Sequence, residues 1–190
     1  MIFKIAGWLL LLMTESLMAK VNIEHWQTSQ GSPVYFIAAP ELPIADIKVV
    51  FDAGSARDGQ QFGIAALTAA LLDTGAEKWN ADQIAQRLES VGAALGSDVS
   101  YDMATLSLRT LTDPKLLDVA LETMHTVLLS PRFAEADFKR DLARTLAGLK
   151  QLEESPAAQA DIAFTKALYG DHPYGHTSEG ELAKPIDYPF

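Results

Sequence analysis

The sequence predicts an α+β fold in which an antiparallel sheet packs against several helices. The β-prone segments come in two groups, residues 34–53 and 93–111, and helical patterns follow each group. Because strands and helices are grouped instead of alternating one by one, an antiparallel sheet is favoured over a parallel one. Apolar residues make up 48% of the 190 residues, which is enough for one core. Residues 20–190 are therefore expected to form a single module.

The first group begins with two apolar, β-prone runs, 34–39 and 44–53. We expect them to pair as neighbouring strands across a turn marked by Pro40 and Pro43. The polar, glycine-rich stretch that follows is expected to be a loop. A helix is then predicted over 63–75, because apolar residues recur there at helical spacing. Its packing stripe consists of Ile64, Leu67 and Leu71.

A second helix is predicted over 81–92, with Asn80 as its N-cap. The segments 93–100 and 101–111 are expected to form an antiparallel pair of strands, since polar and apolar residues alternate in the latter. The second helix would bury one face, which carries Ile84, Leu88 and Val91.

Three further helices complete the pattern. The first is capped by Asp113 and ended by Pro131, and the others are predicted over 134–154 and 156–169. Residues 170–181 are expected to form a loop. The first of these helices is expected to bury a stripe of Leu117, Leu121, Met124 and Leu128.

Charge and cysteine content exclude several classes of function. The net charge is −10 and the pI is near 4.7, and no run of lysine or arginine forms the basic patch that nucleic acid requires. The chain has no cysteine, which excludes disulfides, thiolate metal sites and a cysteine nucleophile.

The N-terminus indicates export. Lys4 is followed by an apolar run over 5–13, and Ala19 stands at the expected cleavage position. This order is typical of a secretory signal, and the run is too short to span a membrane. We expect residues 1–19 to be a signal peptide, and the mature chain to work in the periplasm without a membrane anchor. The alternative is a buried or amphipathic N-terminal helix.

Histidines give only a weak indication of chemistry. His172 and His176 are four residues apart, a spacing that serves zinc when both residues lie on one helix face. Pro173 and Gly175 stand between them, so a surface loop is favoured over a metal site. His125 is expected to be structural. The chain has neither a serine nucleophile elbow nor a phosphate-binding glycine loop.

The aspartates around the first helix are the other candidates for chemistry. Asp52, Asp58 and Asp73 flank it, and paired carboxylates can act in acid–base catalysis. On a chain this acidic, however, scattered aspartates are expected to be solvated.

Several segments together resemble the N-terminal module of the M16 metallopeptidase family (pitrilysin-type or mitochondrial processing peptidase-like). The similarity covers about residues 34–175 and implies the LuxS/mitochondrial processing peptidase-like metallohydrolase fold. Members usually have two such modules, and this sequence is expected to contain one. The segments that carry the resemblance are DAGSARDGQQFGIAALTAALLDTGA, ADQIAQRLESVGAAL, YDMATLSLRTL, DLARTLAGLKQLEESPAAQA and ALYGDHPYG.

The resemblance also implies where a zinc site would lie. Active relatives carry H-x-x-E-H on the helix that starts at Gly63, and a third ligand, a glutamate, on a later helix. In this chain Ala66 and Ala70 occupy the histidine positions, Ala69 the glutamate position and Ala147 the third-ligand position. Since a methyl group donates no electron pair, we expect no metal, no cofactor and no catalytic residue.

In this family such a chain resembles the non-catalytic subunit of a two-chain peptidase. The resemblance therefore implies a partner, a zinc-bearing M16 chain or a second module, with which this chain would enclose peptide substrates. The strand predicted over 44–53 could contact an extended peptide along its edge. One alternative is a zinc-independent peptidase that uses an unrelated site, for example around His172 and His176. The other is a truncated product with only a structural role.

Overall fold

The computed structural model describes residues 21–182 and residue 186. The chain divides into two compact units, residues 1–42 and 43–190, and each is described here by itself. Among the described residues, none of the helices combines the length and the apolar character needed to traverse a lipid bilayer. The predicted signal peptide, residues 1–19, lies outside the described residues.

The first unit contains a β-hairpin. Strands β1 (Ile23–Gln27) and β2 (Pro33–Ile37) pair in an antiparallel register that places Ile23 opposite Ile37. Gly31 makes the tight turn with a left-handed φ of 86°. The predicted pairing of 34–39 with 44–53 is therefore wrong, because a short turn joins β2 to the strand that precedes it.

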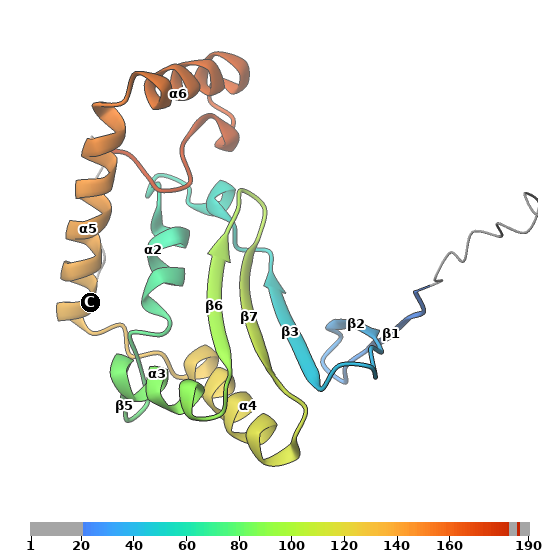
Figure 1. Cartoon of the computed structure of the whole chain (residues 1–190). Helices are drawn as coiled ribbons and strands as arrows, with labels where there is room; N and C mark the ends of the chain where they lie inside the picture. The colour runs from blue at the N-terminus through green and yellow to red at the C-terminus, as the bar shows by residue number, and fades with distance from the viewer. Residues whose placement is uncertain (1–20, 183–185, 187–190) are drawn as a thin grey trace, which may run out of the picture. The chain divides into compact units, whose positions relative to one another are not determined.

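The second unit is built on a three-stranded antiparallel sheet in the order β3-β7-β6 (Figure 1). The strands are β3 (Ile44–Phe51), β6 (Ala94–Val99) and β7 (Ala104–Leu111). β7 is central, and its Leu106 and Leu108 are buried. The predicted pairing of the last two strands is confirmed, and β3 joins β7 on the other side.

Helices α3 (Ala81–Ser90) and α4 (Pro114–Leu129) pack together and complete the main core with the sheet. Asn80 caps α3 through a capping box, as predicted. Next to them a two-residue ladder joins β4 (Gly75–Ala76) to β5 (Trp79–Asn80). The core side chains include Trp79, Ile84, Leu88, Val91, Leu106, Leu108, Met124 and Val127.

The buried stripe of α4 differs from the predicted one. Leu121 is 38% exposed, whereas Thr123 and Val127 are fully buried. Met124 is buried as predicted, and the Thr123 hydroxyl donates a hydrogen bond to the Val119 carbonyl, which satisfies it inside the core. The buried face of α4 therefore includes a threonine as well as apolar residues.

A second group of helices begins with one that contacts β6. α2 (Ile64–Leu71) lies between the sheet and the long helix α5 (Glu135–Glu153) (Figure 1). α5 is followed by α6 (Pro156–Tyr169), which buries no residue completely. α2 is shorter than predicted, because Gly75 belongs to β4 and does not end the helix. Leu67 and Leu71 form a second core cluster, which also contains Phe138 and Ile186.

The segment that connects β3 to α2 lies in direct backbone contact with the β6–β7 turn. It contains the 3-10 turn η1 (Ser55–Arg57), whose Ser55 amide donates to the Ser100 carbonyl. An alanine Cβ at Gly54 would lie 2.3 Å from the Tyr101 carbonyl oxygen and 2.4 Å from the Met103 nitrogen. Glycine is therefore required here by close backbone approach.

We expect Gly54→Ala to lower the free energy of unfolding by about 1–3 kcal/mol, because the added methyl group must push two backbone segments apart. Urea unfolding measures this. Gly96→Ala is the matched control, since its Cβ would meet nothing within 4 Å, and a change below about 1 kcal/mol is expected. Equal effects of the two substitutions would contradict the prediction.

Candidate functional site

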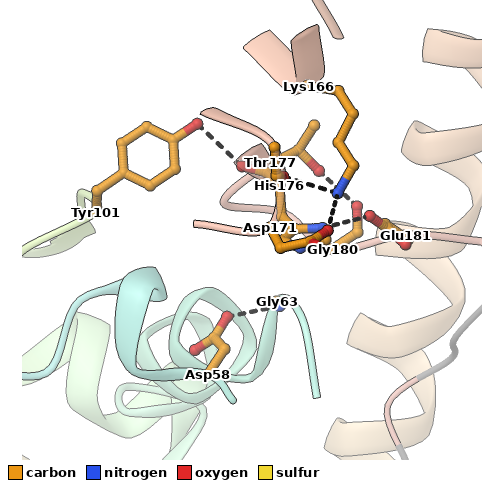
Figure 2. A network of polar contacts seen from close by, with 10 residues as sticks. Asp58, Gly63, Tyr101, Lys166, Asp171, His176, Thr177, Gly180 and Glu181 are labelled. Carbon is orange, nitrogen blue, oxygen red and sulfur yellow. Dashed lines mark hydrogen bonds and ion pairs between the residues drawn. The ribbon is translucent and has the colours of Figure 1, made fainter. Parts of the chain in front are cut away.

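The N-terminus of α2 is fixed by a buried carboxylate. Asp58 is 8% exposed. One of its oxygens accepts a hydrogen bond from the Gly63 N–H at 2.7 Å (Figure 2), and the other accepts one from the Ala65 N–H at 3.1 Å. These donors belong to the first turn of the helix and have no intrahelical partner. Asp58 thus caps α2 from outside the helix and sets where the helix begins.

The segment 175–182, here called the strap, packs against the same end of α2. The His176 ring stacks on Phe62 with 3.7 Å between centroids. Its Nδ1 lies 2.7 Å from Glu181 Oε1, and its carbonyl accepts a hydrogen bond from the Tyr101 hydroxyl (Figure 2). Gly63 has a φ of 90°, and a Cβ there would collide with the Glu179 carbonyl. Asp58 and the strap therefore both constrain the backbone at Gly63, where α2 begins.

The faces of α2 have different surroundings. Leu67 and Leu71 pack toward Phe138 of α5, so the predicted packing stripe is confirmed. Ala66 is half-buried, Ala69 is buried and Ala70 is exposed. The alanine positions of the resemblance thus lie on α2 outside its packing stripe.

Ala69 is the point at which α2 meets the sheet edge. Its carbonyl accepts a hydrogen bond of 2.9 Å from the Ser97 hydroxyl of β6. Ala69 also lines a cavity of about 430 Å³ between α2 and the sheet. Apolar side chains dominate the lining of this cavity, among them Phe51, Ile64, Leu72, Leu106 and Leu128.

The residues present do not fit the zinc ion that the family resemblance implies. Ala147 lies exposed on α5, and it offers no donor atom, like the three alanines of α2. Zinc in proteins takes nitrogen, oxygen or sulfur ligands, and catalytic sites generally supply three. Within residues 21–182 and 186, no cluster of three or more histidine, cysteine, aspartate or glutamate side chains could hold a metal ion.

The other candidate residues make structural contacts. His172 Nδ1 accepts a hydrogen bond from the Tyr174 N–H in the 3-10 turn η2 (Pro173–Gly175). His176 is held by Phe62 and Glu181, as described above. His125 is exposed on α4. The structure therefore gives each residue of the His172–His176 pair a different set of neighbours.

The candidate aspartates are likewise separated by role. Asp52 forms an exposed ion pair with Arg57, whereas Asp58 caps α2. The expectation that Asp58 is solvated is therefore wrong, because its carboxylate is buried against the Gly63 and Ala65 amides. Its capping role was not predicted from the sequence. Two tyrosines tie the β6–β7 turn to η2, since Tyr101 stacks on Tyr174 and the Tyr174 hydroxyl donates to Asp102. This hydrogen bond raises the pKa of Tyr174.

Burial raises the pKa of the Asp58 carboxyl above its ordinary value of 3.8, although the hydrogen bonds from Gly63 and Ala65 act in the opposite direction. The folded state therefore binds more protons than the unfolded state between the two pKa values. The contribution of Asp58 to the free energy of unfolding is then largest at low pH, and it falls as the pH rises through this window.

We expect the unmodified chain to lose stability relative to Asp58→Asn as the pH rises from about 4 to about 7. Urea unfolding of both proteins across this range measures the difference. Asp46→Asn is the control, because the hydrogen bond from Arg109 lowers the pKa of Asp46. The contribution of Asp46 to stability is lost only as the pH falls below about 4, so its difference from the unmodified chain should stay constant over this range. A difference between the unmodified chain and Asp58→Asn that stays constant with pH would refute the prediction.

Comparison with known proteins agrees with this geometry. A Helicobacter pylori protein (strain ATCC 700392 / 26695) named "Non-peptidase homolog YmxG" is 28% identical over 160 residues, which are 83% of this chain and 37% of that protein. The crystal structure of a peptidase M16 inactive domain from Pseudomonas fluorescens has a TM-score of 0.84 and 36% identity, and the match covers 87% of this chain and 40% of that chain.

A further crystal structure, of a protease from Helicobacter pylori, shares the fold with a TM-score of 0.79 and 18% identity, over 89% of this chain and 41% of that chain. This chain thus spans about two fifths of the length of these relatives. The predicted α+β fold is confirmed, and the names of the first two relatives agree with the expected absence of catalysis. Residues 34–181 match the family model described as Insulinase (Peptidase family M16), and the chain belongs to this family.

Proposed function

We propose that this chain is a catalytically inactive M16 module that partners a zinc-bearing M16 peptidase, as a separate chain or a second module, and forms with it a peptide-binding chamber. One observation carries the proposal. The helix that would hold the metal, α2, is kept: it is capped by Asp58 and packed on α5. The metal-site positions, however, are alanines and offer no donor atoms: Ala66, Ala69 and Ala70 on α2 and Ala147 on α5.

The loss of catalysis follows from coordination chemistry. A catalytic zinc ion lowers the pKa of its bound water to about 7 and polarises the scissile carbonyl. Four methyl groups supply neither ligands nor a general base. Two relatives, named a non-peptidase homolog and an M16 inactive domain, support the same reading for this chain.

Peptide binding by the sheet edge is supported by the position of β6. Among the described strands, β3 and β6 are the two edges of the three-stranded sheet. β6 contacts α2 directly, through Ser97 and the Ala69 carbonyl, whereas β3 lies on the far side of β7. An extended peptide added to β6 would therefore run beside the alanine positions, and we favour this edge over the β3 edge.

The N-terminal sequence supports export and a site of action in the periplasm. The charged residue Lys4, the apolar run over 5–13 and Ala19 follow the order of a secretory signal. A periplasmic module would meet its peptidase partner after export, and peptides in that compartment would be its ligands.

Purification of the tagged chain from its own cells tests the proposed pairing. We expect it to retain an M16 chain that carries H-x-x-E-H, identified by mass spectrometry. The complex should contain zinc and cleave peptides, and a chelator should abolish cleavage because the metal lies on the partner. The isolated chain is the control and should show neither zinc nor cleavage. Chelator-sensitive cleavage by the isolated chain would overturn the proposal.

A further inference from the structure

The outer edge of β3 carries unpaired backbone groups. Among the strands that the structure describes, β7 is the one partner of β3 (Figure 1). The Thr112 N–H donates a hydrogen bond to the Pro43 carbonyl. Because hydrogen-bonded positions alternate along an antiparallel pair, the odd-numbered residues of β3 bond to β7 and the even-numbered residues direct their N–H and C=O groups to the outer edge. These outward residues are Ile44, Asp46, Lys48 and Val50.

The side chains along this edge are complementary to those of a second copy of the chain. Two β3 strands that pair antiparallel about Ile47 place Asp46 of one copy opposite Lys48 of the other, and Ile44 opposite Val50. A two-fold axis repeats both pairings. Each pairing joins residues whose N–H and C=O groups face outward, so the two copies can exchange ladder hydrogen bonds at these positions.

The charges select this register over its neighbours. A slip that centres the two-fold axis on Asp46 would place the Asp46 side chains of both copies opposite each other, and a slip to Lys48 would do the same with the two lysines. Like charges directly opposite each other destabilise a strand pair, whereas opposite charges stabilise it. The pairing about Ile47 therefore has no two-fold neighbour with complementary charges.

The charged side chains of the edge are available for this pairing. None of the ion pairs found across residues 21–182 involves Lys48. The Asp46 side chain is 61% exposed and accepts hydrogen bonds from Arg109 of β7. Lys48 of a second copy would approach Asp46 from the other side, so the carboxylate would lie between two cations.

We infer that two copies of this chain associate through β3 and join their sheets across a two-fold axis at Ile47. The outward N–H and C=O groups of the edge would then be paired, and Ile44 and Val50, which are 41% and 55% exposed, would cover each other. The β6 edge stays open on each copy, so this association is independent of the peptide contact proposed there.

A single introduced thiol tests the register, because the chain has no cysteine. The two Ile47 residues would form a non-hydrogen-bonded pair with Cα atoms about 4.5 Å apart, which a disulfide can bridge. Ile47→Cys should therefore give a disulfide-linked dimer when oxidised glutathione is added. Val49→Cys is the matched control on the same half-buried face. It should not cross-link, because the two Val49 Cα atoms would be about 14 Å apart. No cross-link at position 47, or equal cross-linking of both variants, would overturn the inference.

Charge exchange tests the same interface without altering the packed face. Sedimentation equilibrium of the isolated full chain should show a reversible dimer. Lys48→Glu and Asp46→Lys each place like charges opposite one another twice, so each should raise the dissociation constant at least about fivefold. An equimolar mixture of these two variants should dimerise again, because every acidic side chain of one copy then lies opposite a lysine of the other.

Lys115→Glu makes the same change of charge at an exposed position on α4, and its dissociation constant should stay within about twofold of that of the unmodified chain. A chain that sediments as a monomer throughout would overturn the inference. Equal weakening by Lys115→Glu and Lys48→Glu, or no recovery in the mixture, would also overturn it. Purification of the complex with a zinc-bearing peptidase decides the proposed pairing separately.

Discussion

The two hydrogen bonds that Asp58 accepts from Gly63 and Ala65 are the constraint on which the site depends. They fix the first turn of α2, and the strap closes against the same turn through His176 and Phe62. With its start fixed, α2 can present one face to α5 and another to the sheet edge. An eight-residue helix has little stability of its own, so these tertiary contacts decide its position.

The structure explains how a peptidase helix can lose its chemistry and keep its fold. The packing residues Leu67 and Leu71 are distinct from the alanine positions that the family resemblance assigns to metal binding, so the two sets can change independently. Alanine also has the highest helix propensity, and replacement of ligands by alanine therefore costs the helix little. What remains is a helix packed against α5 and β6 that carries no donor atoms at the alanine positions.

Local signals in the sequence predicted much of the fold. Asn80 and Asp113 mark helix starts through their capping side chains, and each caps its helix in the structure. Contacts between distant segments could not be predicted in this way. The pairing of β2 and the burial of Thr123 depend on partners that no local pattern names. The alanine positions came from the family resemblance, whereas the contacts of the strap with Phe62 and Tyr101 arise only in three dimensions.

Zinc content measured by mass spectrometry, after dialysis against zinc-containing buffer and removal of free metal, tests the central claim most directly. The account predicts no stoichiometric zinc on the unmodified chain, because its alanines offer no donor atoms. The combined variant Ala66→His, Ala69→Glu, Ala70→His and Ala147→Glu is the positive control, and it should retain about one ion per chain if the helix framework is intact. One zinc ion per unmodified chain, held by α2 and α5, would contradict the account.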